Sequence, residues 1–266
     1  MKLKKMFLSA AVAGLCAAVP GMAHAVLINQ WDYSVQAEWT SWSPGGVDRV
    51  IGVSTDALRW GTPVNGGGRS SLSVTRFVTS EGAGGPDPII TNSGLPQPGV
   101  TLTHDNFAIK PPTLTNAQLQ IMATFESAEP NLGVGFNIER VFDIDFLETT
   151  NVGPCAVPQS ASVCDDVFIL QNPEDLAGSF EFDGILYTAR LVFDPALFEG
   201  GQIFFADFDG DGDNELFFLT EENTTAILRT GILITAQAVP EPAALGLVGA
   251  GIAGLGFVVR RRSRKA

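Results

Sequence analysis

The sequence predicts an all-β fold for the central part of the chain, an antiparallel β-sandwich of the jelly-roll kind. Many short segments are rich in β-branched and aromatic residues, and several alternate between apolar and polar residues with a period of two. Clusters of glycine and proline, as in residues 82–88 and 94–99, separate these segments. The body shows no long 3.6-residue period and no clear internal repeat, which favours one sandwich over residues 26–238.

Seven segments carry the strand pattern. They are residues 26–35, 71–78, 119–125, 134–146, 167–170, 180–193 and 226–235. The alternation is clearest in residues 141–146 and 180–183, where we expect apolar side chains to face the core and acidic side chains to face solvent. Residues 195–198 indicate a single helical turn.

Residues 1–25 have the three parts of a secretory signal peptide. Three lysines lie within the first five residues, an apolar run covers residues 6–19, and the small-residue triplet Ala-His-Ala ends at Ala25. The apolar run is shorter than the roughly 20 residues that a membrane-spanning helix needs. We therefore expect a signal helix that is cleaved after Ala25, with a retained N-terminal anchor as the alternative.

Residues 239–266 form a tail of different composition. An uncharged apolar run over residues 243–259 is followed by four arginines and a lysine. As a helix that rises about 1.5 Å per residue, this run crosses most of a bilayer core. The basic cluster stays on the cytoplasmic side, because segments rich in Lys and Arg are retained there. The sequence thus predicts one transmembrane helix, with the body on the opposite side of the membrane.

Pro240, Glu241 and Pro242 stand directly before the apolar run of the tail. The triplet, the Gly/Ala/Leu-rich run and the terminal arginines together resemble the PEP-CTERM sorting domain. The resemblance implies recognition and cleavage near the triplet by an exosortase, a membrane-embedded transpeptidase-like protease. It also implies export across the inner membrane of a Gram-negative bacterium to the cell envelope, the outer surface or the extracellular matrix, commonly in organisms that make exopolysaccharide and biofilm. An ordinary single-span anchor is the alternative.

The body between the two ends is strongly acidic. Residues 26–238 contain eight Lys and Arg residues and 28 Asp and Glu residues, a formal balance near −20. Such a charge repels nucleic acid and anionic lipid, so we expect no nucleic-acid partner. The same charge keeps an exported protein soluble and attracts divalent cations.

Two cysteines, Cys155 and Cys164, remain after removal of the signal peptide. An even number of cysteines in an oxidising compartment favours a disulfide, which here closes a short polar loop. A metal site at these thiols is disfavoured, because no further cysteine and a single histidine are left in the body to complete it.

A second resemblance lies inside the body. Thr103, His104, Asp105 and Asn106 follow an extended segment, and the two cysteines and the acidic residues 221–222 come later in the same order. This arrangement resembles the THxN family of PEP-CTERM proteins and covers about residues 99–235. The resemblance implies a family and a location but no reaction.

If the protein is an enzyme, His104 is the candidate general base. Such a reaction also requires a nucleophile next to the imidazole. No Gly-x-Ser-x-Gly motif is present. The favoured alternative is a turn or strand end in which His104, Asp105 and Asn106 form hydrogen bonds with local backbone groups.

The segment from Asp207 to Glu215 has the strongest metal-binding pattern. Acidic residues alternate at every second position, and the intervening glycines allow the loop to wrap around an ion. Ca²⁺ takes six to eight oxygen ligands, which the side chains of Asp207, Asp209, Asp211 and Glu215 and the Asp213 carbonyl partly supply. The strand-like flanks are similar to FG-GAP loops and unlike an EF-hand. The alternative is a solvated acidic hairpin without an ion.

Other acidic pairs, Asp143 with Asp145 and Asp165 with Asp166, imitate a glycosidase pair. Neighbours on alternating strand faces rarely converge, so outward solubilising charge is the favoured interpretation. Four tryptophans lie in the N-terminal third of the chain and are expected to pack in the core, with stacking on sugars as the alternative.

These observations predict a secreted surface or matrix protein without a catalytic role. The first hypothesis is a structural or adhesive component associated with the envelope or with exopolysaccharide. The second is a Ca²⁺-dependent carbohydrate-binding module, and a hydrolase has the least support.

Overall fold

The computed structural model is all-β in the part of the chain that it describes. The described residues are 25–64, 66–82, 84–149, 158–160, 164–171, 177–207, 212 and 214–239. The expected signal helix before Ala25 and the expected transmembrane helix over residues 243–259 lie outside these ranges. Within them, no helix is long and apolar enough to span a membrane.

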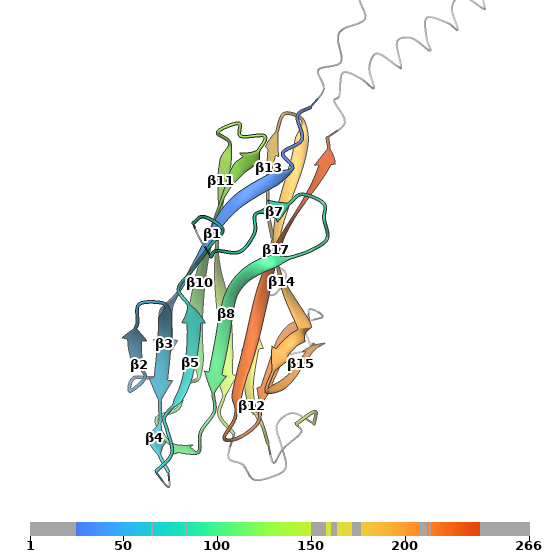
Figure 1. Ribbon diagram of the computed structural model, residues 1–266. Coiled ribbons are helices and arrows are strands. Elements are labelled where there is room, and N and C mark those ends of the chain that lie inside the picture. Colours follow the sequence, from blue (N-terminus) through green and yellow to red (C-terminus); the bar gives the residue numbers. More distant parts are fainter. Residues whose placement is uncertain are drawn as a thin grey trace, which may run out of the picture.

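Two large antiparallel sheets face each other in a sandwich-like arrangement (Figure 1). The first sheet has the order β15-β16-β12-β11-β10-β1-β6, with β7 also paired to β1. Its strands are β1 (Gln30–Ser43), β6 (Phe77–Thr79), β7 (Ile89–Ile90), β10 (Asn116–Glu129), β11 (Gly135–Leu147), β12 (Asp166–Leu170), β15 (Gly201–Ala206) and β16 (Glu215–Thr220).

The second sheet has the order β13-β14-β17-β8-β5-β3-β2. Its strands are β2 (Asp48–Ile51), β3 (Thr55–Trp60), β5 (Ser70–Thr75), β8 (Gln97–Asp105), β13 (Ala177–Phe182), β14 (Ile185–Glu199) and β17 (Thr225–Ala238). A small ribbon of β4 (Thr62–Pro63) and β9 (Ile109–Lys110) completes the described strands. The antiparallel all-β prediction is therefore confirmed, whereas the jelly-roll connectivity stays a prediction.

The core lies between the two sheets and is one continuous cluster of buried side chains from both. Alternate residues of β1 point into it, which explains why the period-two pattern predicted the strand. Trp31, Trp39 and Trp60 are fully buried, and Trp42 packs against the core from its edge. The prediction that the tryptophans serve core packing is confirmed.

The first and last residues of the body meet at one end of the sandwich (Figure 1). The backbone N–H of Val26 donates to Asp183 Oδ2 over 2.6 Å, and that of Val239 donates to the Gly184 carbonyl over 2.8 Å. Both contacts involve the same two-residue turn, so the first and last residues of the body lie next to each other.

Three expected segments differ in detail. Residues 180–193 are two strands, because Asp183 and Gly184 have positive φ values of 50° and 72° and form a tight hairpin turn between β13 and β14. Residues 71–78 divide at Arg76 into β5 and β6, which belong to different sheets. The helical turn expected at residues 195–198 is wrong, because this segment is part of β14.

Asp56 on β3 is a fully buried carboxylate that joins the two sheets. Its Oδ2 accepts a hydrogen bond from the Trp39 backbone N–H over 3.0 Å, and its backbone carbonyl accepts one from Trp39 Nε1 over 3.1 Å. Arg49 on β2 compensates the charge, with Nε at 2.9 Å from Asp56 Oδ1. A second, longer contact links Arg49 to the exposed Glu38 over 3.2 Å.

We expect Arg49→Met to lower the free energy of unfolding by about 3–5 kcal/mol, because it leaves the buried Asp56 carboxylate without its cation. The control Glu38→Gln removes the exposed end of the same network and should change stability by less than about 1 kcal/mol. Urea denaturation of the three proteins measures both values. Equal losses of unfolding free energy in the two variants would contradict the larger contribution of the Arg49–Asp56 ion pair.

Candidate functional site

Several strands of both sheets end together opposite the body's termini (Figure 1). A layer of polar side chains lies at this end. It lies where β8 ends, β12 and β17 begin, and the chain leaves β11. We call it the polar end layer and define it as His104, Asn106, Glu148, Asp166 and Thr220. All of these are buried except Glu148, which is partly buried.

Strand alternation carries Glu148 and Asp166 to the inner face. Phe146 on β11 is paired with Phe168 on β12, and both are buried in the core. Glu148 lies two residues beyond Phe146, just after the end of β11, and Asp166 lies two residues before Phe168, at the start of β12. The charge of Glu148 acts on Asp166 across this strand end. Asp166 is in turn paired with Thr220 on β16. The inner row thus changes from aromatic to acidic at the end of the sheet.

Hydrogen bonds hold both carboxylates in place. Trp60 Nε1 donates to Glu148 Oε2 over 2.9 Å, and the Thr149 backbone N–H donates to Asp166 Oδ1 over 2.9 Å. The second oxygen, Asp166 Oδ2, is buried and accepts no hydrogen bond from any described residue. Among the ion pairs of the described residues, none includes Glu148 or Asp166.

This environment favours the neutral form of both acids. Burial raises the pKa of Glu148 to about 7, with the Trp60 hydrogen bond lowering it and the charge of Glu222 raising it. Burial, followed by the charge of Glu148, raises the pKa of Asp166 to about 8.

His104 is a core residue in this layer. Its ring stacks on Trp60 with centroids 5.9 Å apart and meets the edge of Phe146 at 5.1 Å. Burial lowers the pKa of His104 to about 4, so the imidazole is neutral at pH 7. Neither ring nitrogen has a hydrogen-bond partner among the described residues. The expected local backbone hydrogen bonds of His104 are therefore wrong, and no nucleophile is bonded to it as a general base requires.

Asp105 and Asn106 join strands that are distant in sequence. Asp105 accepts hydrogen bonds from Ser71 Oγ over 2.9 Å and from Thr225 Oγ1 over 2.8 Å. Asn106 Nδ2 donates to the Thr220 carbonyl over 3.0 Å in a buried contact between the two sheets. The expected local side-chain bonds are replaced by long-range ones at these two residues.

The first residue of the tetrad, Thr103, takes part through its backbone. Its carbonyl lies 3.5 Å from the Ser73 hydroxyl, a long contact. The Asn106 backbone N–H donates to the Thr224 carbonyl over 2.9 Å. Residues 103–106 thus act as a clamp that ties β8 to β5, β17 and β16.

The predicted calcium loop is described only at its two ends. Asp207 is exposed and its Oδ2 accepts from the Gly212 N–H over 3.2 Å, whereas Glu215 is only 3% exposed. Asp209, Asp211 and Asp213 lie outside the described residues. The strand-like flanks are confirmed as β15 and β16. In the described ranges no group of three or more His, Cys, Asp or Glu side chains is placed to hold a metal ion, so the calcium site stays a prediction.

Cys164 forms a disulfide and is buried. Its predicted partner, Cys155, lies outside the described residues, so that pairing also stays a prediction.

The acidic pairs behave in two different ways. Asp143 and Asp145 on β11 are exposed and accept hydrogen bonds from Gln118 and Gln171, which confirms outward charge. Asp165 and Asp166 are each only 1% exposed, so the expectation of outward charge is wrong there.

Sequence reasoning missed Glu148 and the burial of Asp166. The available signal was the apolar alternation of residues 142–146, which continues to position 148.

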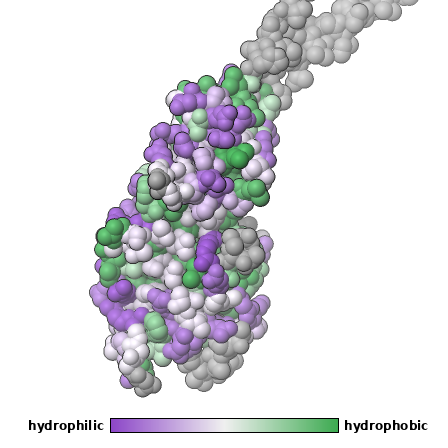
Figure 2. Space-filling model, viewed as in Figure 1, coloured by the Kyte–Doolittle hydropathy of each residue, from purple (hydrophilic) through white to green (hydrophobic). Residues whose placement is uncertain are grey.

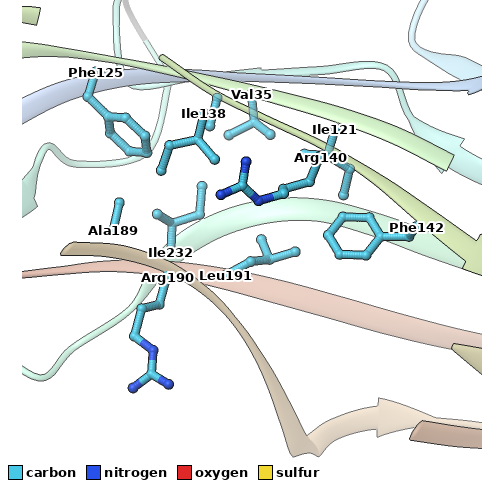
Figure 3. A pocket seen from close by; sticks show the side chains of 11 residues that line it. Val35, Ile121, Phe125, Ile138, Arg140, Phe142, Ala189, Arg190, Leu191 and Ile232 are labelled. Atoms are coloured by element: carbon cyan, nitrogen blue, oxygen red, sulfur yellow. The ribbon is translucent and has the colours of Figure 1, made fainter. Parts of the chain in front are cut away.

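An apolar cavity of about 40 Å³ lies between the sheets (Figure 3). The Arg140 guanidinium lies among its aliphatic side chains and donates to the Ala177 carbonyl over 3.0 Å, whereas Arg190 points away. This volume is far below the roughly 300 Å³ of a small-molecule site. We interpret it as a packing gap.

A polar groove of about 150 Å³ lies on the outer face of the first sheet. It is lined by Asp32, Tyr33, Ser34, Phe77, Thr79, Glu81, Thr124 and Glu126. Phe77 is 51% exposed, an unusual position for an aromatic ring. The face shown in Figure 2 is mostly hydrophilic or neutral, with hydrophobic residues in separate patches.

We expect Asn106→Ala to lower the free energy of unfolding by about 1–3 kcal/mol, because the buried Thr220 carbonyl loses its donor. Asn137→Ala, at an exposed position of β11, is the matched control and should stay within about 0.5 kcal/mol of the unmodified protein. Thermal or urea unfolding followed by circular dichroism gives both values. A loss in the control as large as in Asn106→Ala would contradict the clamp.

Comparison with protein families shows one match, in the tail. Residues 238–262 match the PEP-CTERM protein-sorting motif. The matched range contains Pro240, Glu241 and Pro242, the triplet that suggested this motif from the sequence. Comparisons with curated proteins and with solved structures find no match. The chain carries a PEP-CTERM sorting motif, and this motif implies exosortase-dependent sorting of an exported protein that is associated with the envelope.

Proposed function

We propose that this chain is a structural or adhesive protein of the outer surface or extracellular matrix of a Gram-negative bacterium, associated with exopolysaccharide. The sorting motif at residues 238–262 is the observation that carries the proposal. It implies processing by exosortase and places the protein on an export route. Within this proposal the protein belongs to the THxN group, and its body has no catalytic role.

The geometry of the body supports presentation away from the membrane. The backbone groups of Val26 and Val239 both bond to the turn between β13 and β14. A tail that starts at Val239 therefore holds the sandwich by one end. The end of the sandwich that contains the buried polar end layer then points away from the membrane.

The chemistry of the body supports binding or structure rather than catalysis. His104, the single histidine after the signal peptide, is buried and neutral. The excess of acidic residues keeps the body soluble at high local concentration, as a matrix component requires.

The groove on the outer face of the first sheet supports contact with a polysaccharide. It combines the exposed Phe77 ring with the hydroxyls of Thr79 and Thr124 and the carboxylates of Asp32 and Glu126. An aromatic face packs against sugar C–H groups, and carboxylates accept hydrogen bonds from sugar hydroxyls. The negative charge of the groove favours neutral or amino sugars over anionic ones.

We expect Glu241→Ala in the full-length chain to reduce processing in cells that contain the exosortase, because the acidic residue of the triplet is lost. The measurement is the mass of the mature protein, together with its distribution between membrane, surface and medium. Glu221→Ala, at an exposed position in the body, is the control and should be processed normally. Unchanged processing of the Glu241 variant would contradict the role of the triplet.

The second candidate function is a Ca²⁺-dependent carbohydrate-binding module, favoured by the acidic segment between Asp207 and Glu215. We expect millimolar Ca²⁺ to raise the melting temperature of the protein, because the ion relieves repulsion among clustered carboxylates. Asp211→Asn should weaken this effect, whereas Asp143→Asn, at an exposed position of β11, should not. An unchanged melting temperature would exclude the site.

Glycan binding with and without EDTA then separates the two functions. Binding that survives EDTA fits the structural or adhesive role, and binding that is lost fits the calcium-dependent module.

A further inference from the structure

The Glu148–Asp166 pair is a like-charged pair in a place where both charges cannot easily be kept. We propose that these two carboxyl groups share a proton at neutral pH. The shared proton stabilises the packing of the strand ends at this end of the sandwich, and its loss at alkaline pH loosens that packing. The inference concerns a conformational device and is independent of the proposed matrix role.

The strand register brings the two groups together. β11 and β12 are paired up to Leu147 and Val167. Glu148 follows the last residue of β11, Asp166 is the first residue of β12, and the charge of Glu148 acts on Asp166. Like charges on neighbouring strands within reach of each other are destabilising. Two carboxylates this close inside a protein favour a state in which one of them is protonated.

In the part of the chain that the structure describes, no basic side chain forms an ion pair with either acid. None of the charge interactions at Glu148 or Asp166 comes from a basic side chain, and the one that both share is with the acidic Glu222. The buried Asp165 adds a further acidic residue next to the pair.

The other groups facing the pair are uncharged. Trp60 comes from β3, His104 from β8 and Thr149 from the segment after β11, and the His104 imidazole is neutral at pH 7. A cation that compensates two carboxylates is therefore missing from the described surroundings, and a proton takes over this role.

The hydrogen-bond pattern has a place for the proton. Glu148 Oε2 and Asp166 Oδ1 already accept bonds from Trp60 and Thr149. Asp166 Oδ2 is buried without a donor, an arrangement that is costly for an ionised carboxylate. Protonation turns one carboxyl group into a donor and removes one of the two charges.

The expected pH dependence has a definite sign. An ordinary Asp or Glu in the unfolded chain has a pKa near 4, while burial raises the pKa of Glu148 to about 7 and that of Asp166 to about 8 in the folded protein. The folded state thus binds more protons than the unfolded state above pH 4. Stability falls as the pH rises from about 4 and levels off above the folded-state values.

His104 acts in the opposite direction and in a lower range. Because burial lowers its pKa to about 4, its contribution is complete above the ordinary value near 6.5 and is lost as the pH falls towards 4. Between pH 7 and 9 the His104 contribution is constant, so a change of stability in that window reports the acid pair.

The experiment is thermal unfolding of the purified full-length chain in non-ionic detergent at several pH values from 7 to 9, without Ca²⁺. We expect the melting temperature of the unmodified protein to fall across this window. Glu148→Gln and Asp166→Asn keep the oxygens that accept from Trp60 and Thr149 but remove one acid, so each should flatten the fall. Asp145→Asn, at an exposed position of β11, is the control and should keep the full slope.

A second measurement needs no variant. Unfolding at pH 7.5 in weakly buffered solution should release about one proton per molecule, since the pair loses its proton only when it leaves the folded environment. Hydrogen exchange of the amides in β11 and β12 should also speed up between pH 7 and 9 by more than the intrinsic rate increase.

Two results would overturn the inference. One is a melting temperature that does not change between pH 7 and 9 together with no proton release on unfolding. The other is a stabilisation by millimolar Ca²⁺ that abolishes the pH slope in the unmodified protein and is absent in the Glu148→Gln, Asp166→Asn double variant. That result would show that a bound cation, and not a shared proton, compensates the charge of the two carboxylates.

Discussion

The burial of large apolar side chains between two facing antiparallel sheets is the constraint on which the rest of the structure depends. Each sheet contributes alternate residues of its strands to one continuous core, and the largest of these, Trp31, Trp39, Trp60 and Tyr187, are almost completely removed from water. A strand can supply such a row only when its apolar residues recur with a period of two. The alternation of inward-facing and outward-facing positions continues to the end of each strand, so a polar residue at an inward-facing position there also points toward the core.

This continuation explains the polar end layer. After Phe146 and Phe168 the inner row goes on to Glu148 and Asp166, so acidic groups enter a space that was shaped for apolar ones. The neighbouring polar groups then have to be satisfied across the gap between the sheets. The Asn106 side chain meets this need by bonding to the Thr220 carbonyl, which fastens the second sheet to the first. The tetrad that looked like a local turn motif is thereby a long-range connection.

The two ends of the sandwich have different roles in this arrangement. The end with Val26 and Val239 leads to the sorting motif, and it is held by the turn at Asp183 and Gly184. The opposite end contains the clamp, the acid pair and a disulfide-bonded Cys164.

The sequence by itself determined the all-β class, most strand positions, the core role of the tryptophans and the sorting motif of the tail. These depend on local patterns, namely a period of two, turn residues between strands and a contiguous motif, and such patterns can be read within a few residues. Only the tertiary structure decided that His104 is a neutral core residue, that Asp105 and Asn106 bond to distant strands, and that the charge of Glu148 acts on the buried Asp166. The reason is that strand register and sheet packing bring together residues that are far apart in the chain, and the pKa of an acidic group depends on those neighbours.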